Sequence, residues 1–203
     1  MHNKLFIFDL DGVLVEACDW HRDALNLALS EVSNVKINQE EHITTFNGIP
    51  TKQKLKILTK QGRVALSDHP VINELKQQKT IEIISSEAQV RQEKIDMIRH
   101  IKLNNHKVCC YTNSIRKTAE LMLEKTGILS LFDEVLTNQD VSEPKPSPEG
   151  YNYLINKYGF KPCDTYIIED SPKGIQAAKS SGANVIEVLN ADDVDINTIR
   201  SYT

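Results

Sequence analysis

The chain has 203 residues, of which 40% are hydrophobic and 26% are charged, so we expect one domain or a core domain with a modest insertion. Its formal net charge of −4 argues against a nucleic acid or an anionic membrane as the main partner, and no apolar run approaches the roughly 20 residues that span a bilayer. The N-terminus lacks a signal-peptide pattern and the cysteines lack C-x-x-C spacing, so we expect a reduced, cytoplasmic protein without a zinc or redox motif.

The first predicted element is a strand over residues 4–9, and the long stretch that follows does not fit a single crossover. In DWHRDALNLALSEV the apolar residues fall on one helical face, with Asp19 as the expected N-cap. TKQKLKILTKQG and HPVINELKQQKTIEII are typical of further helices. We therefore predict a small helical module inserted at residues 16–88, and a core formed by residues 1–15 and 89–203.

Beyond the insertion, short apolar runs of strand length end in polar residues or glycine. They are residues 107–112, 134–137, 165–170 and 184–189. Their continuous apolar character, without alternation, predicts strands that are buried on both faces, as in a parallel sheet. Helical patterns separate them, and Gly127 and Gly159 fit helix C-terminal caps. This alternation predicts a Rossmann-like, doubly wound α/β core.

Polar side chains stand at the carboxyl ends of the predicted strands, where ligands bind in open α/β sheets. They are Asp9 and Asp11 after the first run, Thr112, Asn113 and Ser114 after the second, Lys145 after the third, and Glu169 and Asp170 after the fourth. Clustered carboxylates cannot all stay ionised without compensation. Lys145 and a divalent cation can supply it, and hard oxygen ligands with room for phosphate and water suit Mg²⁺. Such groups suit phosphoryl transfer, in which Asp9 attacks phosphorus while Lys145 and Thr112 hold phosphoryl oxygens.

Four motifs resemble, in order and spacing, those of the haloacid dehalogenase (HAD) superfamily of phosphatases and phosphomutases. They are FDLDGVLV, CCYTNS, KPSPEGY and YIIEDSPKGIQAAKSSGA. The resemblance implies that Asp9 is the nucleophile that forms an aspartyl-phosphate and that Asp11 is the general acid and base. It also implies that Thr112 and Lys145 bind the phosphoryl group.

The same resemblance implies a Mg²⁺ site. Asp9, Asp170 and the backbone carbonyl of Asp11 would ligate the ion, with Glu169 coordinating it directly or through water. An insert directly after the first motif matches the helical-cap subgroup, which includes β-phosphoglucomutase and phosphoglycolate phosphatase. Such caps close over the substrate and exclude water.

The substrate is less clear from the sequence. Dehalogenases of the superfamily lack an acid at the position of Asp11, so a phosphotransfer reaction is expected. The candidate substrate-binding residues are Asn113 and His21, which matches a histidine of β-phosphoglucomutase-like proteins, although His21 also fits local packing or capping. Those mutases carry an arginine just past a cap-loop glycine, where FNGIPTKQKL has Thr51 and Lys52. A phosphatase acting on a small phosphorylated metabolite, of the sugar or polyol phosphate type, is therefore favoured over a sugar phosphomutase.

Two further readings come from another class of protein. A phosphoacceptor switch resembling response-regulator receivers also combines acids, a hydroxyl and a lysine on a parallel sheet, but the long insert and Asp11 argue against it. A catalytically silent binding module would not need the full set of motif residues. Ser171 is an expected helix N-cap, with Pro172 at the first helical position. Lys52 and Lys54 are expected to be surface lysines, and the protein is expected to be a monomer or dimer.

Overall fold

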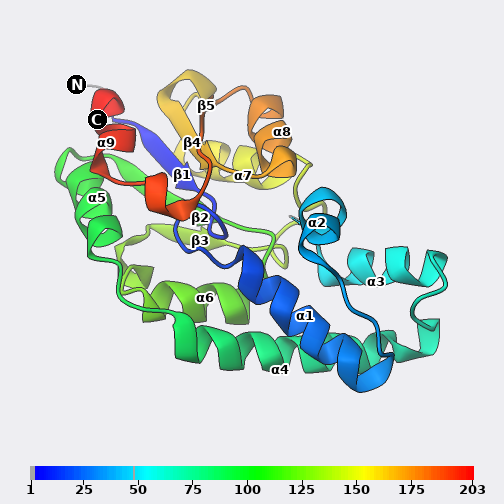
Figure 1. Cartoon of the computed structure of the whole chain (residues 1–203). Coiled ribbons are helices and arrows are strands. Elements are labelled where there is room, and N and C mark those ends of the chain that lie inside the picture. The colour runs from blue at the N-terminus through cyan, green and yellow to red at the C-terminus, as the bar shows by residue number, and fades with distance from the viewer. Residues whose placement is uncertain (1–2, 48) are drawn as a thin grey trace. The chain divides into compact units, whose positions relative to one another are not determined.

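The sheet of the protein is parallel and has the strand order β3-β2-β1-β4-β5. The strands are β1 (Leu5–Phe8), β2 (Lys107–Tyr111), β3 (Glu134–Leu136), β4 (Thr165–Glu169) and β5 (Asn184–Glu187). In this computed structural model, which describes residues 3–47 and 49–203, Leu5 of the central strand pairs with Lys107 on one side and Thr165 on the other. The predicted α/β fold with a parallel sheet is confirmed (Figure 1).

The chain divides into two units. The first contains Met1–Glu16 and Ala88–Thr203, and the second contains Ala17–Glu87. The insertion predicted at residues 16–88 and its role as a cap stay predictions. Gly48, the glycine of the FNGIPTKQKL loop, lies outside the described residues.

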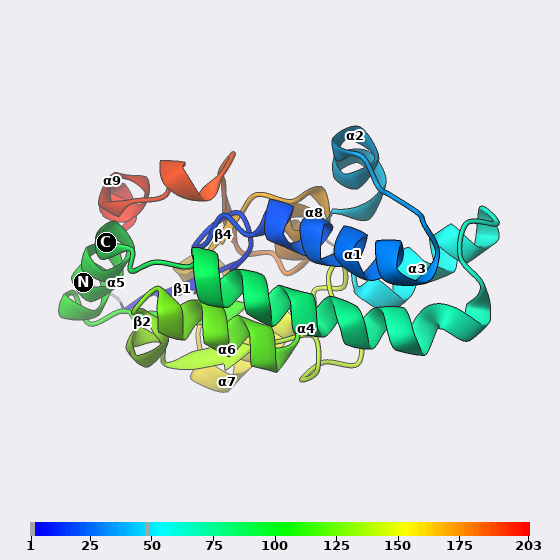
Figure 2. The same cartoon turned by 60° about the horizontal axis from the view of Figure 1, so that its bottom comes forward.

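Helices cover both faces of the sheet in the first unit. They are α5 (Gln92–Leu103), α6 (Arg116–Lys125), α7 (Glu149–Tyr158), α8 (Pro172–Ser180) and the short α9 (Ile196–Ile199). Helices α7 and α8 share one buried cluster with alternate strand residues such as Leu5, Ile7 and Tyr111. Figures 1 and 2 show α5, α6 and α9 on the opposite side of the sheet from α7. Because both faces are covered, the central strand β1 is apolar and buried throughout.

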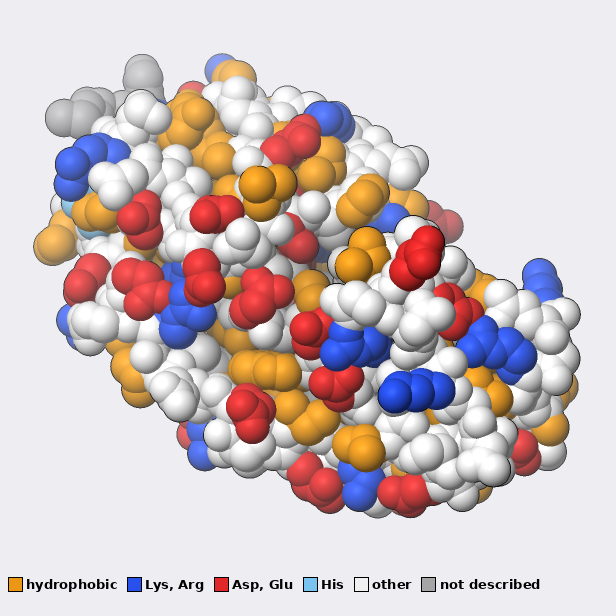
Figure 3. Space-filling model, viewed as in Figure 1, with side chains coloured by type: hydrophobic (Ala, Val, Ile, Leu, Met, Phe, Trp, Pro, Cys, Tyr) orange, Lys and Arg blue, Asp and Glu red, His pale blue; other side chains and the backbone are white. Residues whose placement is uncertain are grey.

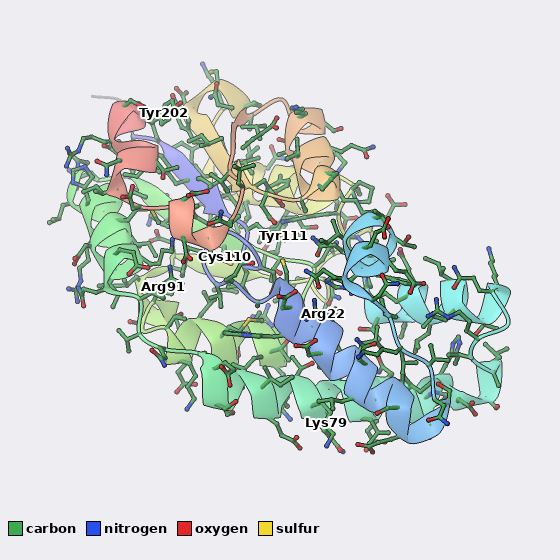
Figure 4. All side chains as sticks on the ribbon, viewed as in Figure 1. Arg22, Lys79, Arg91, Cys110, Tyr111 and Tyr202 are labelled. Atoms are coloured by element: carbon green, nitrogen blue, oxygen red, sulfur yellow. The ribbon has the colours of Figure 1, made fainter. Side chains whose placement is uncertain are left out.

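Hydrogen bonds and an ion pair join the C-terminal segment to the start of α5. The buried Lys94 donates hydrogen bonds from Nζ to the carbonyls of Ala191 and Val194. Arg91, labelled in Figure 4, pairs with Asp192 at 2.7 Å. Burial, followed by the charge of Arg91, lowers the pKa of Lys94 from 10.5 to about 8. On the face in Figure 3, acidic side chains gather over this region with basic ones among them.

The second unit is helical. It contains α1 (Cys18–Val32), α2 (Gln39–Glu41), α3 (Thr51–Lys60) and α4 (His69–Glu87), with a π-helical turn over His42–Phe46. Helices α1 and α4 lie side by side in Figures 1 and 2 and enclose an apolar core that includes Leu25 and Ile72. In the described residues, no helix is long and apolar enough to cross a membrane.

The predicted N-cap of the first helix is wrong. Helix α1 begins two residues earlier than expected, so Ala17 occupies the N-cap position without a capping side chain. Asp19 instead lies within the first turn and pairs with Arg22, one turn further on, at 2.9 Å. A carboxylate in the first turn still interacts favourably with the positive end of the helix dipole. Asp19 therefore does mark the start of this helix, but from a position inside the first turn instead of the N-cap.

Candidate active site

The central strand delivers Asp9 to the carboxyl edge of the sheet, and a tight turn follows it. The Asp9 N–H donates to the carbonyl of Ile168 in β4 at 3.0 Å, which extends the sheet pairing by one residue. Gly12 then adopts a φ of +91°. A Cβ atom there would lie 2.3 Å from Oδ2 of Asp170. Glycine is therefore required both for the backbone conformation and for the close approach of Asp170.

Lys145 joins two carboxylates in the interior of the site. Its Nζ donates to Oδ1 of Asp9 at 2.6 Å and to Oε1 of Glu169 at 2.5 Å. All three side chains are buried. Burial alone would lower the pKa of Lys145, but Asp9 and Glu169 raise it well above its ordinary value, so the ammonium keeps its charge.

The pKa of Asp9 moves in the direction expected for a crowded acid. Burial raises it well above the usual range, Lys145 opposes the rise, and the charges of Glu169 and Asp170 add to it. Burial, followed by the charge of Glu169, raises the pKa of Asp170 from 3.8 to about 7. One ammonium is therefore too little positive charge for the carboxylates gathered here.

The carboxylate of Glu169 is fully occupied by donors. Its Oε1 accepts from Lys145 and, at 3.0 Å, from the hydroxyl of Tyr151. Its Oε2 accepts from the Asp170 N–H at 3.1 Å and from the N–H and hydroxyl of Ser171, each at 3.2 Å. A direct metal bond to Glu169 would have to replace one of these donors, so the geometry favours the alternative in which Glu169 acts through water.

The acidic cluster fits a hard cation. One carboxylate oxygen from each of Asp9, Glu169 and Asp170 lies within 4.8 Å of the others. Oδ1 of Asp170 is buried and has no hydrogen-bond partner among the described residues. An ionised oxygen in that position is costly unless a cation lies beside it. Carboxylate oxygens are the ligands that Mg²⁺ prefers, so the donor set agrees with the predicted metal.

Strand β2 brings hydroxyl groups to Asp11. Oδ2 of Asp11 accepts from the Ser114 hydroxyl at 2.8 Å and from the Thr112 hydroxyl at 3.3 Å. The Ser114 N–H in turn donates to Oγ1 of Thr112 at 3.0 Å. The structure thus brings the predicted residues Asp11 and Thr112 together at one edge of the sheet, beside Asp9, the first carboxylate of FDLDGVLV.

Asn113 holds the backbone of the lysine loop. Its Nδ2 donates to the carbonyl of Lys145 at 3.1 Å, and its Oδ1 accepts from the Lys145 N–H at 3.0 Å. These two hydrogen bonds fix the peptide groups on either side of the Lys145 side chain. Asn113 therefore has a positioning contact in this structure, and its role in substrate binding stays a prediction.

A model of the haloacid dehalogenase-like hydrolase family matches residues 6–188 of the chain. The chain belongs to this family. It is 36% identical over 84 residues to the validoxylamine A 7'-phosphate phosphatase of Streptomyces hygroscopicus subsp. limoneus, over 41% of this chain and 39% of that protein. It is 26% identical over 184 residues to the fructose-1-phosphate phosphatase of Escherichia coli strain K12, over 90% of this chain and 94% of that protein. The resemblance inferred from the four motifs is confirmed.

A solved structure shares the fold. The β-phosphoglucomutase of Clostridium difficile superposes with a TM-score of 0.83 at 20% identity, over 98% of this chain and 96% of that one. At this identity the similarity concerns the fold alone. The prediction that the protein is an enzyme of the haloacid dehalogenase-like hydrolases rests on the family match and is confirmed.

The sequence did not assign roles to several residues that complete the site of this hydrolase. Ser114 lies in CCYTNS and Tyr151 in KPSPEGY, and both donate to site carboxylates. Gly174 is required because a Cβ atom there would lie 1.8 Å from Oε1 of Glu169. The predicted N-cap is confirmed, since Ser171 accepts from the Gly174 N–H at 3.1 Å and Pro172 opens α8.

The second unit holds the remaining predicted residue, His21. Its Nδ1 lies 3.2 Å from Nζ of Lys76, a distance at which the ammonium can donate a hydrogen bond to this ring nitrogen. The role of His21 in substrate binding stays a prediction. Lys52 is exposed as expected, but the expectation for Lys54 is wrong because its side chain is buried. Lys54 shares the inner face of α3 with Leu58, and its charge alone had suggested a surface position.

Proposed function

We propose that the protein is a Mg²⁺-dependent phosphomonoester hydrolase that works through an aspartyl-phosphate at Asp9. The observation that carries the proposal is the contact of Lys145 with Asp9 at 2.6 Å, beside the unpartnered oxygen of Asp170. The arrangement supplies a nucleophile, a fixed positive charge and a cation site at the end of one central strand. Asp11 lies two residues further on and provides an acid that a phosphatase needs.

The reaction has two halves. A carboxylate oxygen of Asp9 attacks phosphorus, an O–P bond forms, and the ester P–O bond breaks with its electron pair leaving on the substrate oxygen. Asp11 gives its proton to that oxygen, which departs as an alcohol. Asp11 then takes a proton from water, whose oxygen attacks phosphorus and releases inorganic phosphate from Asp9.

The surrounding residues bind and orient the phosphoryl group in this scheme. Lys145 balances the charge on the phosphoryl oxygens, and Thr112 donates a hydrogen bond to one of them. Asp9, Asp170 and the backbone carbonyl of Asp11 would hold Mg²⁺, which supplies charge neutralisation at the carboxylates and the phosphoryl group when bound. Donors already occupy both oxygens of Glu169, which supports a role through water.

The substrate we propose is a small phosphorylated metabolite of the sugar or polyol phosphate type. A relative that the chain matches over 94% of that protein's length is named a fructose-1-phosphate phosphatase, which supports this class. Thr51 and Lys52 stand where mutases carry an arginine, which favours hydrolysis over a sugar phosphomutase reaction. We further propose that the second unit is a cap that excludes water, that His21 contacts the substrate, and that the enzyme is cytoplasmic.

A substrate panel tests the proposal. Purified protein with Mg²⁺ is incubated with sugar, polyol and nucleotide monophosphates, and released phosphate is measured. We expect release from at least one compound, loss of release with EDTA, and recovery on adding Mg²⁺. Asp9→Asn keeps the size of the side chain and should abolish turnover, so activity retained by that variant contradicts the nucleophile assignment. Analysis of the products separates hydrolysis from isomerisation by a mutase.

A further inference from the structure

The ammonium of Lys145 lies between two tyrosine rings. Its Nζ is 4.9 Å from the ring centroid of Tyr111 and 5.2 Å from that of Tyr151. The two rings meet edge to face, with centroids 5.0 Å apart and an interplanar angle of 87°. All three side chains are buried. A cation within about 6 Å of an aromatic centroid is attracted to the ring face, and more strongly where water is excluded.

The hydroxyls of the two tyrosines have different surroundings. That of Tyr151 donates at 3.0 Å to Oε1 of Glu169, the oxygen that also accepts from Lys145. That of Tyr111 is buried and has no hydrogen-bond partner in the described part of the chain. The two rings therefore flank the same ammonium, but only one of them also orients a carboxylate that holds it.

Gly150 makes room for this arrangement. A Cβ atom on Gly150 would lie 2.3 Å from Cζ of Tyr111. Gly150 stands in the first turn of α7, immediately before Tyr151. Every side chain other than hydrogen at that position would displace the ring of Tyr111, so the end of β2 and the start of α7 are matched to each other around Lys145.

We propose that Tyr151 is a positioning residue of the active site. Its hydroxyl fixes Glu169, and its ring together with that of Tyr111 holds the Lys145 ammonium against Asp9. A lysine side chain has a flexible four-carbon stem, and a charge that is to stabilise a transferring phosphoryl group works best when it is held in place beforehand. The inference rests on the proposed function in one respect, namely that Lys145 faces the phosphoryl group.

Two matched variants test the proposal. Tyr151→Phe and Tyr158→Phe each remove one hydroxyl from a tyrosine of α7, but only the first loses a hydrogen bond to Glu169, because the hydroxyl of Tyr158 donates to the carbonyl of Asp133 at 3.3 Å. Calorimetry measures binding of inorganic phosphate in Mg²⁺, p-nitrophenyl phosphate reports kcat and KM, and thermal unfolding reports stability. We expect Tyr151→Phe to weaken phosphate binding and to lower kcat by on the order of tenfold, which corresponds to one hydrogen bond to a charged group. Tyr158→Phe should stay within about twofold of the wild type in both.

The outcomes separate this inference from the proposed function. If Tyr151→Phe binds phosphate as tightly as Tyr158→Phe, the positioning role is overturned whether or not the wild type hydrolyses phosphomonoesters. If the wild type hydrolyses none of them but Tyr151→Phe alone weakens phosphate binding, the proposed function fails and the positioning role stands. A wild type that neither binds phosphate nor hydrolyses a phosphomonoester overturns both. Should Tyr151→Phe fail to fold, Gly150→Ala perturbs the same ammonium through Tyr111, and unchanged phosphate binding in that variant overturns the proposal.

Discussion

Asp170 gives the sharpest prediction, because the structure indicates that its charge opposes folding when no cation is bound. Its pKa is raised from 3.8 to about 7, and each pKa unit corresponds to about 1.36 kcal/mol, so at pH 8 the ionised group costs the metal-free protein about 4 kcal/mol. The native state binds the proton more tightly than the unfolded chain. This contribution therefore lowers the free energy of unfolding as the pH rises from about 4 to 7.

Asp170→Asn removes the charge and nearly keeps the shape of the side chain. We expect the metal-free variant to be more stable than the wild type by about 2–4 kcal/mol at pH 8, the lower figure allowing for adjustment of Asp9 when its neighbour changes. The variant should also lose the stabilisation that Mg²⁺ gives the wild type, since an amide is a poorer ligand for this ion than a carboxylate. Urea unfolding in EDTA and in Mg²⁺ measures both effects.

Asp140→Asn is the matched control in the same unit. Its carboxylate accepts from Arg116 at 2.6 Å and from the N–H of Thr137 at 2.7 Å. Although burial opposes it, these donors lower the pKa of Asp140, so removing this charge should destabilise the protein, opposite in sign to the change at Asp170. A metal-free Asp170→Asn protein that is less stable than the wild type, or that Mg²⁺ stabilises just as much, refutes the reasoning.

Further predictions concern a glycine, a buried lysine and a buried histidine. Gly174→Ala places a methyl group on Glu169 and should lower kcat at least about tenfold with a reduced Tm, while a wild-type kcat in the variant contradicts the contact. Lys94→Ala removes a charged donor from two carbonyls and should destabilise the protein by about 2–3 kcal/mol in urea, with faster hydrogen exchange near Ala191. Burial lowers the pKa of His42 from 6.5 to about 4, so it binds a proton more weakly than in the unfolded chain and its contribution to stability falls as the pH drops from 6.5 to 4. His42→Phe removes two buried ring nitrogens that have no hydrogen-bond partner among the described residues. It should abolish that loss of stability and raise the free energy of unfolding at pH 5 by about 1–2 kcal/mol, and an unchanged acid profile contradicts this.

The sequence predicts the strand ends well because the physics there is local. A continuous apolar run followed by Asp9 or Thr112 indicates where a buried strand reaches the edge of the sheet, and parallel strands bring these ends together. The N-cap of α8 is also local, since Ser171 is followed by a proline that can only open the helix. Such features depend on neighbours in the sequence and need no knowledge of the tertiary contacts.

Other parts of the site depend on residues far apart in the chain. Tyr111 and Gly150 fit each other only after β2 and α7 pack together, and neither residue indicates this by its type. Lys54 carries a charge that is typical of the surface, yet its place on the inner face of α3 buries it. The hydrogen bond between Tyr151 and Glu169 likewise joins two motifs that are separate in the sequence, KPSPEGY and YIIEDSPKGIQAAKSSGA. The sequence therefore contains both residues but does not indicate that they are in contact.

The carboxylates of the site also differ in the hydrogen-bond donors that surround them. Glu169 accepts hydrogen bonds from Lys145 and from four further donors, and one oxygen of Asp9 accepts from Lys145. Oδ1 of Asp170 has no such donor among the described residues, and its pKa is raised. A cation therefore gains most by lying beside Asp170, while Glu169 contributes by holding Lys145. In the proposed enzyme the ammonium therefore lies beside Glu169 and Oδ1 of Asp9, and the cation would lie beside Asp170, so that Asp9, at the end of the central strand, is the carboxylate that both positive charges share.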